Sequence, residues 1–100
     1  MNNFNFDSKG LRVFKRDDSL WFCCKDLENI LNNSSNKNIL RLPYHMRSQF
    51  YTMTSIGIHK LNYVNLQGLE SILNSSIKNI SLVKRVKSWI DKYVVPSMVV

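Results

Sequence analysis

Amide and basic side chains gather between residues 25 and 42 in a pattern that suits nucleic-acid binding. A small polar turn separates two short helical patterns, which is the arrangement of a helix–turn–helix. The second helix would present Asn36, Lys37, Asn38 and Arg41 outward. Arg and Lys bind phosphates or guanine edges, and Asn can bind adenine through two hydrogen bonds. The segment predicts DNA contact; the alternative is an ordinary solvated helix face.

A second group of basic residues lies on or just after a predicted strand. Arg12, Lys15 and Arg16 follow an alternation set by the apolar Leu11 and Val13. Because successive side chains of a strand point to opposite faces, we expect Arg12 to face solvent and to be free to contact phosphate. Charges on an edge strand also prevent aggregation, and the sequence leaves both interpretations open.

A third basic group lies near the carboxyl end of the sequence. It consists of Lys84, Arg85, Lys87 and Lys92. Such a face can contact phosphates or a membrane surface, but a solvated surface is the more common role. A membrane role would also need an accessible apolar face, whereas Trp89 and Ile90 are expected in the core.

The residue types that metal binding and catalysis need are poorly arranged. His45 and His59 have no Cys or His at zinc-like spacing, and Cys23 and Cys24 are adjacent, which suits neither a thiolate pair nor an ordinary disulfide. The sequence contains no Gly-rich phosphate loop, paired-carboxylate motif or Ser/His/Asp spacing. We expect no catalytic residue, no metal and no cofactor, and two core cysteines.

The charge balance agrees with a polyanionic partner. The 100 residues suit one domain with one core, and 14 Lys and Arg against 7 Asp and Glu give a formal net charge of +7. This surplus predicts attraction to DNA, RNA or an anionic membrane. No apolar run reaches the roughly 18 residues that span a bilayer, and the first residues lack the pattern of a signal peptide. We therefore expect an intracellular protein.

Hydrophobic periodicity predicts the elements that position these residues. Strands are expected around residues 4–6, 11–15 and 20–23, with turns at 8–10 and 17–19, and a later hairpin at 49–54 and 58–64 around Gly57. The third strand is apolar on both faces and is expected to be central. Helices are expected from Lys25 to Leu31, from Ser34 or Ser35 to just before Pro43, from the cap Asn65 to Ser75, and from Ser81 to Val94.

The last helix is expected to end at Pro96. Its apolar stripe comprises Val83, Val86, Trp89, Ile90 and Tyr93. The mixture of signals predicts an α+β domain: a small antiparallel sheet, made of three N-terminal strands and a later hairpin, packed with about four helices.

Several short motifs occur in one order along the chain. They are Phe4-Asn5-Phe6, Leu11-Arg12-Val13, Trp21-Phe22-Cys23-Cys24-Lys25-Asp26-Leu27, Ile30-Leu31, Tyr63-Val64-Asn65-Leu66-Gln67-Gly68-Leu69, Ser75-Ser76, and Trp89-Ile90 followed by Val95-Pro96-Ser97. Over residues 3–98 the chain resembles the Bro-N domain, the amino-terminal module of baculovirus-repeated-ORF proteins and of prophage antirepressors. In that family the third strand and first helix read Trp-Phe-x-x-Lys-Asp, and a Gly-Leu pair opens a later helix.

The resemblance implies a DNA-binding regulatory domain of a virus, phage or prophage, not an enzyme. Residues 1–100 would form one such domain, excised from a longer protein or standing alone, in a bacterial cytoplasm or in the nucleus or cytoplasm of a eukaryotic host. Trp21, Phe22, Leu27, Leu69 and Trp89 would be fold determinants. The partner would be double-stranded DNA. We assign phosphate contacts to Arg12, Lys15, Arg16, Lys37, Arg41 and Arg47, and base contacts to Asn36 and Asn38.

Two other roles fit the same sequence. The domain could be a protein-interaction module that binds a repressor through its basic face, or it could modulate a host protein without a DNA role. A homodimer would suit a regulator that reads two half-sites, although no coiled-coil heptad marks one.

Overall fold

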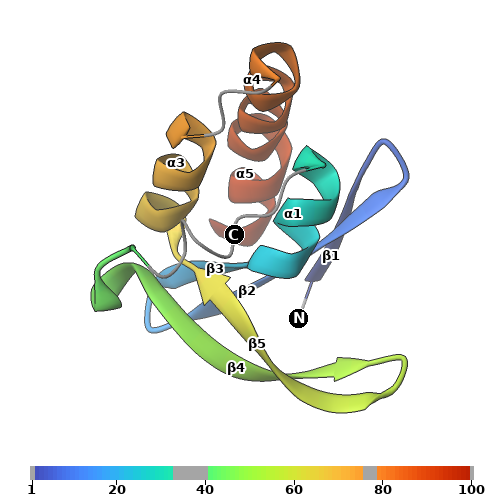
Figure 1. Cartoon of the computed structure of the whole chain (residues 1–100), viewed down its shortest axis with the longest axis vertical. Helices are drawn as coiled ribbons and strands as arrows, with labels where there is room; N and C mark the ends of the chain where they lie inside the picture. The colour runs from blue at the N-terminus through green and yellow to red at the C-terminus, as the bar shows by residue number, and fades with distance from the viewer. Residues whose placement is uncertain (1, 33–40, 76–78, 100) are drawn as a thin grey trace.

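The computed structural model describes residues 2–32, 41–75 and 79–99. Its strands are β1 (Asn2–Phe6), β2 (Lys9–Arg16), β3 (Ser19–Cys23), β4 (Arg47–Thr54) and β5 (Gly57–Val64). All neighbouring strands are antiparallel, in the order β1-β2-β3-β5-β4 (Figure 1). The central place of β3 confirms the prediction from its apolar residues.

The two N-terminal hairpins have tight turns with left-handed backbone. Asp7 and Ser8 have φ of 49° and 69°, and Asp17 and Asp18 have φ of 52° and 63°. Turns with positive φ at both central residues match the twist of paired strands, and Asp tolerates this conformation. The turn expected at residues 8–10 was placed too late, since Gly10 lies within β2 opposite Asn5.

The described helices are α1 (Cys24–Leu31), the short 3₁₀ helix η1 (Tyr44–Met46), α3 (Leu66–Ser75), α4 (Ile80–Trp89), the π-helical segment η2 (Ile90–Val94) and α5 (Val95–Val99). With the sheet they confirm the α+β class, with fewer long helices in the described ranges than expected. Asn65 caps α3 as expected, because its Oδ1 accepts a 3.0 Å hydrogen bond from the Gly68 N–H. The second expected helix falls outside the described residues, except for Arg41 and Leu42, which are not helical.

The prediction that Pro96 ends the last helix was wrong. The helix passes through η2 and continues into α5, and the N–H of Val95 bonds the carbonyl of Ile90, five residues back. This wider turn advances the helix register by about one residue. As a result Val94 is buried, whereas Tyr93, expected in the apolar stripe, is 63% exposed.

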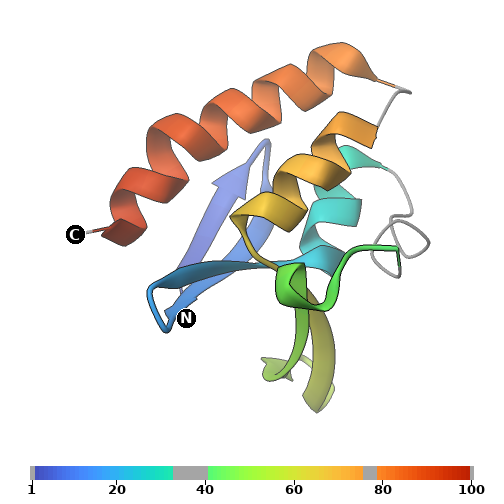
Figure 2. The ribbon, with the colours of Figure 1, turned by 90° about the vertical axis from the view of Figure 1, so that its left-hand side faces the viewer.

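The core lies between one side of the sheet and the helices. Leu11, Val13, Phe22 and Val64 of the strands have no exposed surface, and they pack against apolar residues of α1, α3 and α4. The three helices lie on this side of β1–β3, whereas the β4–β5 hairpin projects away from them (Figures 1 and 2). No helix in the described ranges is long and apolar enough to span a membrane.

Candidate nucleic-acid interface

Aromatic rings meet on the side of the sheet that the helices leave open. Phe14 of β2 contacts Phe50 of β4 at 4.8 Å and Tyr63 of β5 at 5.2 Å, and Trp21 of β3 contacts Phe50 at 5.4 Å, all edge to face. Strand alternation explains the side, because Phe14 follows the buried Val13. Phe14, Trp21 and Phe50 are only half-buried, so their rings form a partly open aromatic floor.

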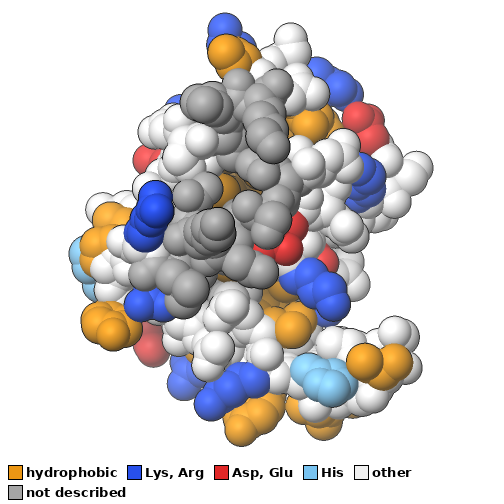
Figure 3. All heavy atoms as spheres, in the orientation of Figure 1, with side chains coloured by type: hydrophobic (Ala, Val, Ile, Leu, Met, Phe, Trp, Pro, Cys, Tyr) orange, Lys and Arg blue, Asp and Glu red, His pale blue; other side chains and the backbone are white. Residues whose placement is uncertain are grey.

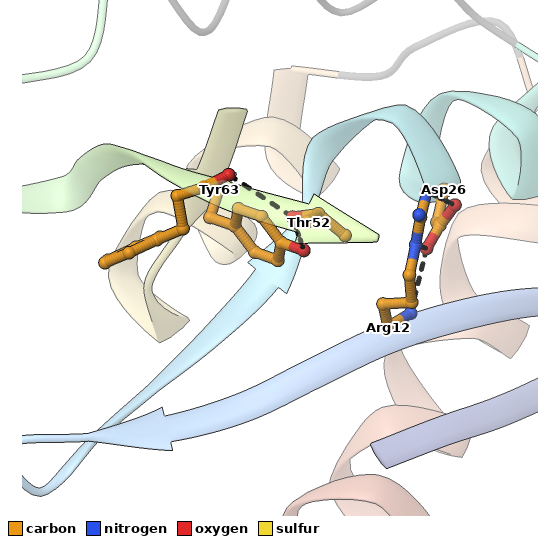
Figure 4. Close-up of polar contacts among 5 residues, drawn as sticks. Arg12, Asp26, Thr52 and Tyr63 are labelled. Carbon is orange, nitrogen blue, oxygen red and sulfur yellow. Dashed lines mark hydrogen bonds and ion pairs between the residues drawn. The ribbon is translucent and has the colours of Figure 1, made fainter. Parts of the chain in front are cut away.

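A hydrogen bond holds this floor in place. Tyr63 is fully buried, and its hydroxyl lies 2.8 Å from the hydroxyl of Thr52, which is itself only 2% exposed (Figure 4). Burial raises the pKa of Tyr63, so its hydroxyl stays protonated. The bond links β4 to β5 next to the half-buried rings.

Above the floor runs an open groove of about 1010 Å³. We call it the sheet groove. It is lined by the aromatic residues Phe14, Trp21, Phe50 and Tyr51 and by the basic residues Lys15, Arg16 and Lys60. The groove is lined by residues of the β2–β3 hairpin and of the β4–β5 hairpin, so residues distant in sequence share it.

The charge of the sheet groove is positive. Arg16 Cζ lies 5.3 Å from the centroid of the Phe50 ring, and Lys60 Nζ lies 5.4 Å from that of Tyr51. Both cations are solvent-exposed, and Asp17 is the one acidic side chain among the described lining residues. Guanidinium and ammonium groups in such a groove can bind phosphates, and the rings beside them hold the cations by cation–π contact.

Arg12 does not have the free, solvent-facing side chain that the sequence predicted. Its guanidinium makes two hydrogen bonds to the carboxylate of Asp26, at 2.8 and 2.9 Å, and its backbone N–H makes a third of 2.9 Å (Figure 4). The bond to Asp26 raises the pKa of Arg12. Arg12 does alternate with the buried Leu11 and Val13, but β3 ends at Cys23 and α1 begins at Cys24, so Asp26 of α1 lies close enough to bind its side chain.

The other predicted contacts divide into three groups. Lys15 and Arg16 lie together in the sheet groove. Arg47 is half-buried: its Nε donates to the carbonyl of Leu42 at 3.1 Å, and its guanidinium lies over the Tyr44 ring. Arg41 is exposed. The predicted contacts at Asn36, Lys37 and Asn38 lie outside the described residues.

The basic residues of the last helix have solvated side chains. Lys84, Arg85, Lys87 and Lys92 are exposed, and Arg85 forms a 3.0 Å ion pair with Asp7. Trp89 packs its ring at 5.3 Å from that of Phe6. The exposure of these basic side chains agrees with a solvated helix surface that covers the core.

The cysteines are buried and form no disulfide. Burial raises the pKa of Cys24 to about 12 and also raises the pKa of Cys23. A buried, protonated thiol is a weak nucleophile. In the described ranges no three His, Cys, Asp or Glu side chains gather as metal ligands would.

Sequence reasoning missed the contribution of the β4–β5 hairpin to this site. It predicted the hairpin itself, but gave no role to Tyr51 or Lys60. One signal was present: the sequence has no Asp or Glu between Glu28 and Glu70. An acid-free stretch that includes a whole hairpin indicates a surface suited to an anion.

Comparisons with known proteins give no further assignment. We found no significant match to a protein-family model, to a curated protein or to a solved structure.

Proposed function

We propose that this protein is a DNA-binding regulatory domain that holds duplex DNA against the sheet groove. The observation that carries the proposal is the combination of Lys15, Arg16 and Lys60 in one open groove, in a chain of formal net charge +7. Neutralising phosphates with such cations releases counterions and drives binding. The resemblance to the Bro-N domain supports the same role, as a viral, phage or prophage regulator of transcription.

The experiment is a salt titration of duplex binding, followed by fluorescence anisotropy. The variant Lys15→Ala/Arg16→Ala should weaken binding about tenfold or more at moderate salt. It should also make the log–log salt slope shallower, since each lost phosphate contact removes about 0.9 from the slope. Both side chains are exposed, so the variant should fold normally.

Two matched variants remove the same charge elsewhere. Lys84→Ala/Lys87→Ala lies on the solvated last helix and should change the affinity less than twofold. Lys37→Ala/Arg41→Ala tests the helix–turn–helix segment that the sequence favoured. If the wild type binds duplex with no salt dependence, the proposal is wrong. It is also wrong if Lys15→Ala/Arg16→Ala keeps its affinity for duplex while one of the two matched variants loses it.

A protein-interaction module is the second candidate. It is favoured by the exposed apolar side chains of the β4–β5 hairpin, among them Met53 and Ile58. A repressor or host protein bound at this surface would be displaced by excess plain duplex if both share the groove. Stable capture from nuclease-treated extract that duplex does not affect would favour this second role.

A further inference from the structure

The β4–β5 hairpin has one side whose residues change in kind from its base to its tip. Directly opposed residues of paired strands share a side, and so do alternate pairs. The pairs Gln49–Asn62, Tyr51–Lys60 and Met53–Ile58 therefore lie on one side of the hairpin. We call these six residues the ribbon face. It offers an amide pair at the base, an aromatic and cationic pair in the middle, and an apolar pair near the tip.

Contacts across the strands agree with this arrangement. Gln49 Nε2 donates a 3.0 Å hydrogen bond to Asn62 Oδ1, and Lys60 Nζ lies 5.4 Å from the centroid of the Tyr51 ring. The amide nitrogen of Asn62 is not used in its bond to Gln49, and it can donate to a ligand. Gln49, Tyr51 and Lys60 also line the sheet groove, so the ribbon face is continuous with it.

The tip of the hairpin exposes large apolar side chains to solvent. Met53 is 71% exposed, Ile58 is 63% exposed, and Ile56 in the turn is 82% exposed. In Figure 3 the tip forms a lobe that carries hydrophobic side chains and a histidine. Among the described residues, Met53, Ile56 and Ile58 neither belong to the hydrophobic core nor pack against it, and the hairpin joins the rest of the sheet through the pairing of β5 with β3.

We propose that the ribbon face enters the minor groove of duplex DNA and that Met53 and Ile58 wedge between base pairs and bend the helix. This inference rests on the proposed function. Proteins that bind the minor groove combine amide and basic side chains with apolar wedges such as Met and Ile. The minor groove of A·T pairs offers only acceptors, which suits the amide nitrogen of Asn62. The DNA backbone would then continue into the sheet groove.

Charge favours DNA over a second copy of the chain. The sequence has no acidic residue between Glu28 and Glu70 and a formal net charge of +7. Two such ribbon faces would bring like charges together, with Lys60 of each copy near the contact. A polyanion meets no repulsion on the hairpin.

The test measures bending apart from binding. A duplex with an A·T-rich centre and a dye at each end reports its bend by energy transfer. The wild type should bend it by between about 20° and 90°. Met53→Ser/Ile58→Ser should abolish the bend and weaken binding about threefold to thirtyfold, with an unchanged salt slope because no charge is lost.

Matched variants separate the wedge from a general loss of apolar surface. Ile80→Ser/Tyr93→Ser removes two side chains that are 61% and 63% exposed on the last helix, and it should keep the full bend. Met53→Leu/Ile58→Leu should bend as the wild type does. Asn62→Ala should reduce the preference for A·T-rich over G·C-rich centres. Circular dichroism and thermal melting verify that each variant is folded.

The outcomes distinguish the two proposals. If the wild type binds duplex but leaves it straight, or if Met53→Ser/Ile58→Ser bends it fully, the wedge is wrong and the groove proposal stands. If the wild type binds no duplex, both are wrong. If the same substitutions instead abolish self-association in sedimentation, the ribbon face is an interface between copies and the inference fails.

Discussion

The two sides of the β1–β3 sheet carry similar residue types but differ in what covers them. On one side Val13 and Phe22 are fully buried under the helices. On the other, Phe14 and Trp21 occupy the alternate positions of the same strands and remain half-buried, with Phe50 across them. An aromatic residue in this sheet can therefore belong to the core or to the partly open aromatic floor. The difference is made by which side the helices occupy, not by the hydrophobicity of the residue.

The largest effect expected from this difference is on stability. Phe22→Ala empties a fully buried place in the core and should lower the free energy of unfolding by about 3–5 kcal/mol. Phe50→Ala removes the same ring from the open side, where solvent already reaches it, and should cost clearly less. Urea unfolding measures both. Equal losses would contradict the division into a core side and an open side.

For DNA binding we expect the opposite order, with Phe50→Ala losing more affinity than Phe22→Ala. Phe50→Ala should weaken duplex binding, because the ring forms the floor of the sheet groove beside Arg16. The remaining folded fraction of Phe22→Ala should bind as the wild type does. A core side chain and a floor side chain are thereby separated by two measurements on two variants.

Much of the fold could be predicted from the sequence, because the periodicities are local. The central β3, the hairpin around Gly57 and the Asn65 cap each follow from a few neighbouring residues. The register of the last helix could not be predicted in this way. Its π-helical turn exchanges Tyr93 for Val94 in the core, and an α-helical period contains no sign of the extra residue.

The candidate site was harder to predict, because it depends on which strands become neighbours. The sequence predicted phosphate contacts at Lys15 and Arg16, which stay predictions, but Lys60, which lines the same groove, belongs to a hairpin distant in sequence. The expectation of a free Arg12 side chain was wrong for the same reason, since its partner Asp26 lies on another element, whereas its phosphate contact stays a prediction. The segment that contains Lys37 gives no outcome, because it lies outside the described residues.

A smaller loss of stability is expected where α3 packs closely against the sheet. At Gly68 of α3 an added Cβ would lie 2.8 Å from the carbonyl oxygen of Met46 and 2.9 Å from the Cβ of Val64. Gly68→Ala should therefore displace α3 from the sheet and cost about 1–3 kcal/mol. Gly10→Ala is the matched control, because its Cβ would meet nothing closer than 3.8 Å. Thermal melting should show a clear loss for the first variant and little change for the second.

The smallest expected loss of stability concerns the ion pair of Asp26, which lies where β3 ends and α1 begins. Asp26 and Arg12 form a partly buried ion pair, with side chains 14% and 21% exposed. Asp26→Asn should cost about 1–2 kcal/mol, which is less than a fully buried pair would lose. The control Asp7→Asn breaks an ion pair whose partners are about 60% exposed, and it should cost at most about 1 kcal/mol.

The same two variants test whether Arg12 can still serve as the phosphate contact that the sequence predicted. Each removes one negative charge, so the change in net charge is the same in both. Asp26→Asn also loosens the hold on Arg12, a residue of the strand that carries Lys15 and Arg16 into the sheet groove. Asp7→Asn releases only Arg85 on the last helix. Tighter duplex binding by Asp26→Asn than by Asp7→Asn would assign Arg12 a contact that the ion pair restrains. Equal binding would leave Arg12 with a purely structural role, namely to join β2 to α1.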